Sequence, residues 1–181
     1  MSAVSNVDRH WLLTWTTYGT WLPGDERGFV GPVRDVDGAK RNRNEVGAPY
    51  RAGGEFIGRA AEIAMGGRPL YLSVEHASLV RDQVLETARH RGWTVRAVAV
   101  MANHVHVLVG VPGDPEPETL LRDLKSWASR ALNERFEVPD GGRWWTRSGS
   151  KRKKVGAGVG QAVAYVRDQE HALAVWVEAG G

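Results

Sequence analysis

Cysteine is absent from this chain of 181 residues, and its absence removes several classes of chemistry. Disulfide bonds, thiolate metal sites and cysteine nucleophiles are all excluded. The first residues lack the apolar stretch of a secretory signal, and no apolar run approaches the ~20 residues of a membrane-spanning helix. We therefore expect a cytoplasmic protein with no membrane partner.

Positive and negative charges nearly balance: the net charge is only +3, although the sequence pI is 9.4. The distribution of the charges therefore matters more than their sum. Hydrophobic residues make up 42% and charged residues 25%, which is ordinary for a globular protein, and the length predicts a single domain over residues 1–181. The eight tryptophans are an excess, and both cores and base-stacking surfaces use this residue.

Hydrophobic periodicity predicts alternating strands and helices that are interrupted by one long insertion. The predicted strands are residues 10–18, 69–74, 94–101, 104–111 and 143–147, and the predicted helices are residues 78–92, 118–135 and 159–170. This order is that of an α+β, ferredoxin-like fold. We expect an antiparallel sheet with two helices on one face and the C-terminal helix on the other. Residues 19–68 show no clean period and are predicted to be an irregular insertion.

The tripeptide His104-Val105-His106 is the most informative motif. Side chains alternate faces along a strand, so both histidines point to one face while Val105 points to the other. Two imidazoles roughly 7 Å apart along a strand can bind one metal ion. Because the rest of this strand is apolar, two polar rings on one face favour a functional role.

Tyr165 and Gln169 supply the two groups that such a site still needs. They lie four residues apart on the predicted C-terminal helix, so they project together, away from its apolar stripe. Gln169 is a candidate third ligand and Tyr165 a candidate nucleophile. Three glycines at positions 156, 158 and 160 are predicted to form a flexible joint before this helix. Their spacing does not fit a dinucleotide-binding fingerprint.

A basic segment precedes the glycines and is a candidate nucleic-acid-binding surface. Its members are cations that could contact phosphates and a tryptophan that could stack on bases. They are Arg143, Trp145, Arg147, Lys151, Arg152 and Lys153. A solvated basic loop is an equally good interpretation from the sequence alone.

These motifs together resemble the single-tyrosine HUH transposases, the insertion-sequence 200/605-like family, and most of all its REP-associated branch. The resemblance covers residues 10–18 and most of 69–169. Its specific anchors are the stretch MANHVHVLV at residues 101–109 and the stretch AYVRDQ at residues 164–169. The stretch TWTTYGTWLPGD at residues 14–25 also looks like the opening of many REP-associated members.

The resemblance implies a function and a role for each candidate residue. His104, His106 and Gln169 would bind Mg²⁺ or Mn²⁺, and Tyr165 would attack DNA and become linked to its 5′ phosphate. The implied partner is single-stranded DNA near a hairpin, which would bring the protein to the nucleoid. A monomer and a homodimer both stay open.

Two departures from the family pattern stand out. Asp168 replaces the asparagine that often precedes the metal-binding glutamine, and the insertion at residues 19–68 is longer than in the shorter insertion-sequence enzymes. Two alternatives also stay open. One is a catalytically silent protein that binds DNA hairpins, and the other is a metal-dependent hydrolase in which water attacks.

Overall fold

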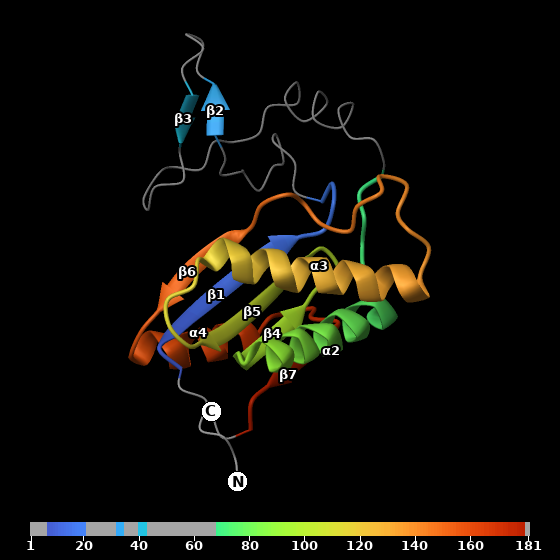
Figure 1. Ribbon diagram of the computed structural model, residues 1–181. Helices are drawn as coiled ribbons and strands as arrows, with labels where there is room; N and C mark the ends of the chain where they lie inside the picture. The colour runs from blue at the N-terminus through green and yellow to red at the C-terminus, as the bar shows by residue number, and fades with distance from the viewer. Residues whose placement is uncertain (1–6, 21–31, 35–39, 43–67, 180–181) are drawn as a thin grey trace.

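The computed structural model describes residues 7–20, 32–34, 40–42 and 68–179. Its centre is a five-stranded antiparallel sheet in the order β6-β1-β5-β4-β7 (Figure 1). The strands are β1 Arg9–Thr16, β4 Thr94–Val100, β5 His104–Val111, β6 Ser150–Lys154 and β7 Ala174–Val177. The helices are α2 Val74–Arg91, α3 Pro117–Arg135 and α4 Ala157–Arg167.

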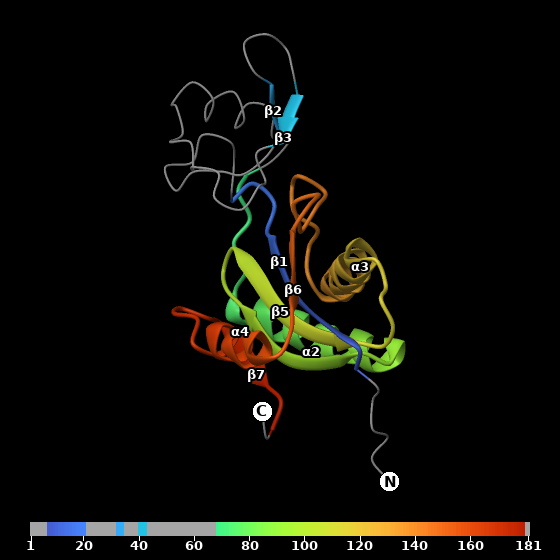
Figure 2. The same ribbon diagram turned by 90° about the vertical axis from the view of Figure 1, so that its left-hand side faces the viewer.

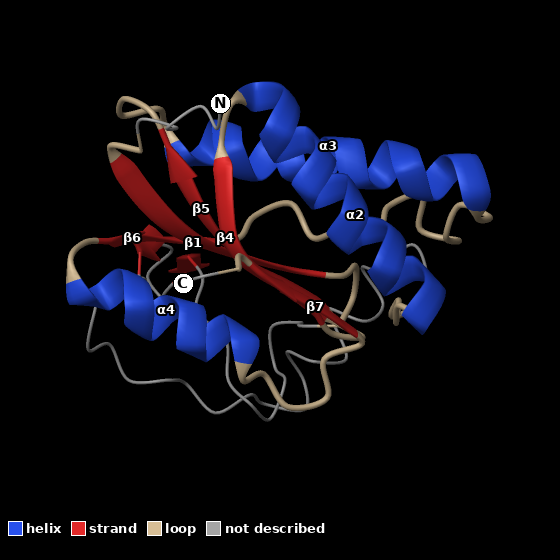
Figure 3. Ribbon diagram, turned by 90° about the horizontal axis from the view of Figure 1, so that it is seen from below, coloured by secondary structure: helices blue, strands red, loops and turns tan. Residues whose placement is uncertain are grey.

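The helices lie on opposite faces of this sheet, with α2 and α3 on one face and α4 on the other (Figures 2 and 3). Alternation along the strands explains both layers. Leu13, paired with Val107, packs into the core under α2 and α3, whereas Leu12, paired with Leu108, packs against α4. The predicted α+β, ferredoxin-like fold is confirmed.

Helix α2 begins four residues before the predicted start. Ser73 is its N-cap: its hydroxyl accepts from the His76 N–H, while the His76 ring accepts from the Ser73 N–H. This reciprocal cap closes the helix end as a capping box does. The strand predicted at residues 69–74 is absent. Instead of pairing with a strand, the N–H of Leu70 donates to the Tyr18 carbonyl and the N–H of Leu72 donates to the Ala102 carbonyl.

The C-terminal part departs most from the predictions. Residues 143–147 are not a strand; only Trp145 forms an isolated bridge, with Thr17. The basic residues that follow form β6 instead. This strand lies at the edge of the sheet and pairs through its backbone with β1 alone, so it needs no apolar side chains to join the sheet. Strand β7 was not predicted, and α4 ends at Arg167 rather than at residue 170.

The predicted insertion lies mostly outside the described residues. Within it, β2 Pro32–Arg34 and β3 Lys40–Asn42 pair as a small antiparallel hairpin. Among the described residues, no helix combines the length and apolar character needed to span a membrane.

Candidate active site

His106 lies at the centre of the sheet, on the face that α4 covers. In the strand pairing it lies between Thr14 of β1 and Ala99 of β4. Its side chain is buried, and its Nδ1 lies 2.6 Å from the Thr14 hydroxyl oxygen. Burial, and to a smaller extent the neighbouring His104, lower the pKa of His106 to about 4. At neutral pH the ring is therefore uncharged, as a metal-binding imidazole must be.

His104 lies beside His106 on the same face, with 4.9 Å between the ring centroids. Its Nδ1 lies 2.6 Å from the side-chain oxygen of Asn103, in the turn before β5. The Asn103 carbonyl in turn accepts a hydrogen bond from the backbone N–H of Thr17 over 2.9 Å, and the buried hydroxyls of Thr17 and Thr20 lie 3.2 and 3.3 Å from it. The segment after β1 thus holds the turn that positions the first histidine.

Tyr165 approaches the histidines from α4. Its hydroxyl oxygen lies 3.4 Å from Nε2 of His106, and the two ring centroids are 5.2 Å apart. The tyrosine is half exposed, so its hydroxyl has access to a ligand at the surface. The neighbouring Val166 is buried and anchors the helix on the sheet. The predicted meeting of the tyrosine with the histidine pair is therefore present.

Gln169 lies two residues beyond the end of α4, so the predicted continuous helix through it is wrong. It nevertheless stays beside the tyrosine, because its side-chain amide nitrogen donates to the Tyr165 carbonyl over 2.9 Å. Asp168 makes a two-pronged ion pair with Arg167 at 2.7 and 2.8 Å. That pair lowers the pKa of the Asp168 carboxyl.

The donor set fits a divalent cation. Each histidine has its Nδ1 beside a side chain that can fix the ring, Asn103 for His104 and Thr14 for His106, so Nε2 is the nitrogen that would coordinate a metal ion. Among the described residues, no group of three His, Cys, Asp or Glu side chains could hold a metal. A third protein ligand from this described part of the chain would therefore be of another type, such as the Gln169 amide oxygen.

The predicted nucleic-acid-binding residues are divided between the two faces of the sheet. Lys151 and Lys153 of β6 pair with Leu13 and Trp11, on the side of α3. Arg152 pairs with Leu12 and so lies on the side of the histidines.

The other three predicted residues, Arg143, Trp145 and Arg147, line a cavity beside α3. Both arginines are exposed, whereas Trp145 is buried edge-on against Trp15, which leaves little of its ring for a base to stack on.

The glycine joint is shorter than predicted. Only Gly156 precedes α4, and its φ of 51° is a backbone conformation that favours glycine. Gly158 and Gly160 lie within the first turn of the helix.

This chain is similar to known transposases. A family profile described as "Transposase IS200 like" matches residues 67–169, more than half of the chain. Among solved structures, a REP-associated tyrosine transposase bound to a REP hairpin is similar, with 11% sequence identity and a TM-score of 0.46. The match covers 89% of this chain but only 66%, just under two thirds, of the transposase chain. A candidate transposase from Deinococcus radiodurans R1 has 17% identity and a TM-score of 0.49, over 90% of this chain and 92% of its own. No curated protein matches.

Proposed function

This chain belongs to the IS200-like transposase family, and from that premise we propose that it cleaves single-stranded, hairpin-associated DNA through a covalent phosphotyrosine at Tyr165. The observation that carries the proposal is the 3.4 Å approach of the Tyr165 hydroxyl to Nε2 of His106, with His104 alongside. The proposed nucleophile and the two rings proposed to bind the metal would therefore share one surface.

His104, His106 and Gln169 would hold Mg²⁺ or Mn²⁺ through two imidazole nitrogens and one amide oxygen. Two uncharged imidazoles and one amide carry no negative charge, so they would not offset the positive charge of a bound ion. When bound, such an ion polarises a phosphoryl oxygen and stabilises the charge that develops on it. That help matters, because a phenol with a pKa near 10 is a poor nucleophile at neutral pH.

The covalent step belongs to Tyr165. Its oxygen attacks the scissile phosphorus and forms a phosphotyrosine bond to the 5′ phosphate of one DNA product. The bond between that phosphorus and the 3′ oxygen of the other product breaks. The tyrosine loses one proton and the leaving 3′ oxygen gains one, so the step is balanced. Because one phosphodiester replaces another, a later attack by a free 3′ hydroxyl can rejoin strands without ATP.

A labelled single strand carrying a hairpin, incubated with Mn²⁺ and separated on a denaturing gel, tests this directly. The wild-type protein is expected to give a band in which protein and DNA migrate together. Tyr165→Phe removes one oxygen from a half-exposed ring, so it should bind the DNA as well as wild type and yield no such band.

The other results on the same gel identify the alternatives. Cleaved DNA without an adduct, retained in Tyr165→Phe, would mean that water is the nucleophile. Tight binding with no cleavage under any divalent metal would mean a silent hairpin-binding protein.

A further inference from the structure

Three segments that lie far apart in the sequence meet at the turn before β5. They are residues 17–20, which follow β1, residues 70–72, which precede α2, and the turn itself at residues 102–103. Backbone N–H groups join each segment to the other two. They donate to carbonyls at 2.9, 2.9 and 2.7 Å, from Thr17 to Asn103, from Leu70 to Tyr18 and from Leu72 to Ala102. We call this meeting point the turn junction.

The side chain of Thr17 lies at the centre of the turn junction, and Thr17 is completely buried. Its hydroxyl oxygen is 2.6 Å from the Leu70 carbonyl oxygen and 3.2 Å from that of Asn103. A hydroxyl has one proton to donate, and the shorter distance indicates that Leu70 accepts it. The same oxygen lies 3.0 Å from the Thr20 hydroxyl. This one side chain therefore contacts all three segments.

Gly19 makes the bend that returns Thr20 to the turn junction. Its φ of 75° lies in the left-handed region, which glycine adopts without steric cost. The buried hydroxyl of Thr20 is then 3.0 Å from the Thr17 carbonyl oxygen and 3.3 Å from that of Asn103. The order Thr-Tyr-Gly-Thr at residues 17–20 thus has a structural reason, which none of the proposed catalytic roles supplies.

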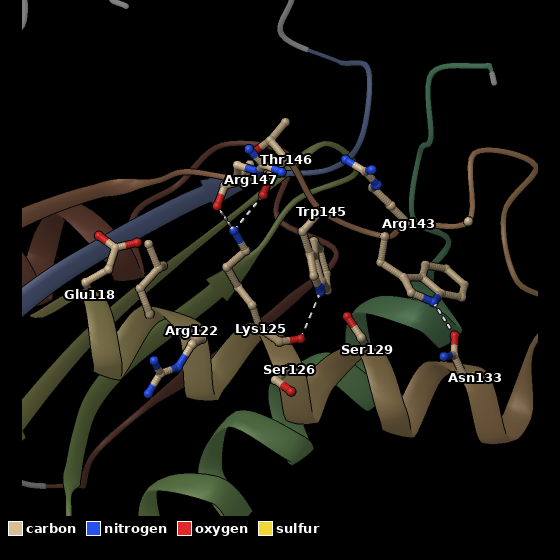
Figure 4. A pocket seen from close by; sticks show the side chains of 13 residues that line it. Glu118, Arg122, Lys125, Ser126, Ser129, Asn133, Arg143, Trp145, Thr146 and Arg147 are labelled. Carbon is tan, nitrogen blue, oxygen red and sulfur yellow. Dashed lines mark hydrogen bonds between the residues drawn. The ribbon is translucent and has the colours of Figure 1, made fainter. Parts of the chain in front are cut away.

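The other side of residues 16–18 is anchored to α3. These residues pair with residues 144–146 through two backbone hydrogen bonds of 2.9 and 3.0 Å. Nε1 of Trp145 donates to the Lys125 carbonyl over 3.1 Å, and Nζ of Lys125 donates to the Thr146 carbonyl over 2.6 Å (Figure 4). The segment that holds the turn is therefore itself held by the helical layer.

The turn passes this constraint on to the first histidine. The Asn103 side-chain oxygen lies 2.6 Å from Nδ1 of His104. An amide oxygen only accepts hydrogen bonds, so Nδ1 carries the ring proton and Nε2 carries the lone pair that can coordinate a metal. The ring keeps this tautomer and this orientation only while Asn103 stays in place.

We propose that Thr17 is a positioning residue for His104: its hydroxyl fixes the turn at residues 102–103, and the Asn103 side chain then orients the ring. The proposal rests on the proposed function only for the metal ion, because the ring has its tautomer and orientation without one. His106 has a different neighbour, the Thr14 hydroxyl at 2.6 Å from its Nδ1. A change at the turn junction should therefore reach His104 and not His106.

Thr17→Val removes the hydroxyl and keeps the shape of the side chain. In NMR spectra of ¹⁵N-labelled imidazoles, we expect the ring nitrogens of His104 to shift toward the average of the two tautomers, while those of His106 stay as in wild type. Mn²⁺ affinity, measured by calorimetry, should fall about tenfold. Thr17→Ser loses a buried methyl group but keeps the hydroxyl. It should restore the His104 signals and the affinity, even where it lowers the free energy of unfolding.

Thr87→Val is the matched control. Thr87 is a buried threonine of α2, and its hydroxyl accepts from Nε2 of Gln83 over 3.2 Å. Helix α2 lies on the face of the sheet opposite the histidines. This variant removes a buried hydroxyl elsewhere, so the His104 signals and the Mn²⁺ affinity should be those of wild type.

The possible results separate this proposal from the proposed function. Unchanged His104 signals in a folded Thr17→Val would overturn the positioning role, and so would an equal change at His106, in Thr17→Ser or in Thr87→Val. Hydrogen exchange of the wild-type protein needs no variant: the amides of Leu70 and Leu72 should be protected as strongly as those of β5, and rapid exchange there would also overturn the role. Failure of the wild-type protein to bind Mn²⁺ would count against the proposed function alone, because the ring signals are recorded without metal.

Discussion

Replacing Thr14 with valine removes one oxygen beside His106 and keeps the shape of the side chain. The Thr14 hydroxyl lies 2.6 Å from Nδ1 of His106, and Thr14 faces that histidine across the β1–β5 pairing. We expect Nδ1 to carry the ring proton and to donate a hydrogen bond to this hydroxyl, which would direct Nε2 toward the proposed metal ion. In Thr14→Val, that N–H would face a methyl group inside the protein.

Two magnitudes follow from this geometry. Leaving a buried donor unsatisfied costs about 1–3 kcal/mol of folding stability. Losing the group that orients a metal-binding histidine typically weakens metal binding about 10–100-fold. The two effects are of similar size, because a loss of affinity of about 10–100-fold corresponds to about 1.4–2.7 kcal/mol, and the loss of Mn²⁺ affinity should appear in protein that is still folded.

Titration of Mn²⁺ by calorimetry, with NMR of ¹⁵N-labelled imidazoles as a check on the ring proton, measures both effects. Thr16→Val is the matched control. Thr16 is two residues along β1 and pairs with His104 across the β1–β5 register, but its hydroxyl lies 3.0 Å from that of Thr146. It should leave Mn²⁺ affinity unchanged. Equal affinities for wild type and a folded Thr14→Val would contradict this role of the Thr14 hydroxyl.

Three further predictions concern acid stability, packing and the third ligand. The pKa of His106 is about 4 in the folded chain against 6.5 as its ordinary value, so its contribution is complete above pH 6.5 and is lost as the pH falls toward 4. Between pH 7 and about pH 4.5, the free energy of unfolding, measured with denaturant, should fall by up to about 3 kcal/mol less in His106→Gln than in wild type. Identical decreases in the two proteins would contradict this. A Cβ on Gly149 would lie 2.6 Å from the Thr14 carbonyl oxygen, so Gly149→Ala should lower the free energy of unfolding by about 1–3 kcal/mol. Gly158→Ala should lower it by nothing, because no atom lies within 4 Å of the added Cβ. Similar unfolding midpoints for the two variants would count against this packing. Gln169→Ala should weaken Mn²⁺ binding about tenfold or more while Gln169→Glu retains it, and unchanged affinity in Gln169→Ala would remove the glutamine from the ligand set.

The central hairpin of the sheet could be predicted because its signals are local. Alternation along β5 and the turn before it place both histidines on one face without reference to distant residues. The apolar stripe of α3 predicts that helix to within one residue of its observed start at Pro117.

The rest depends on long-range pairing that a local pattern does not contain. Thr14 and Asn103 reveal their contacts with the histidines only once β1 is paired with β5 and the turn is folded. Strand β6 has no apolar alternation, because its sequence is Ser-Lys-Arg-Lys-Lys and it joins the sheet through its backbone. Trp145, which precedes it, looks like part of a strand but packs as an anchor under α3.

Mass spectrometry of the covalent adduct can identify the residue that carries the DNA. After nuclease digestion, trypsin should release residues 155–167, a peptide that contains Tyr165 and no other tyrosine, serine or threonine. We expect this peptide to carry a nucleotide attached through its 5′ phosphate, together with a free 3′ hydroxyl on the other DNA product. An adduct on any other peptide, or cleavage with the peptide always unmodified, would contradict it.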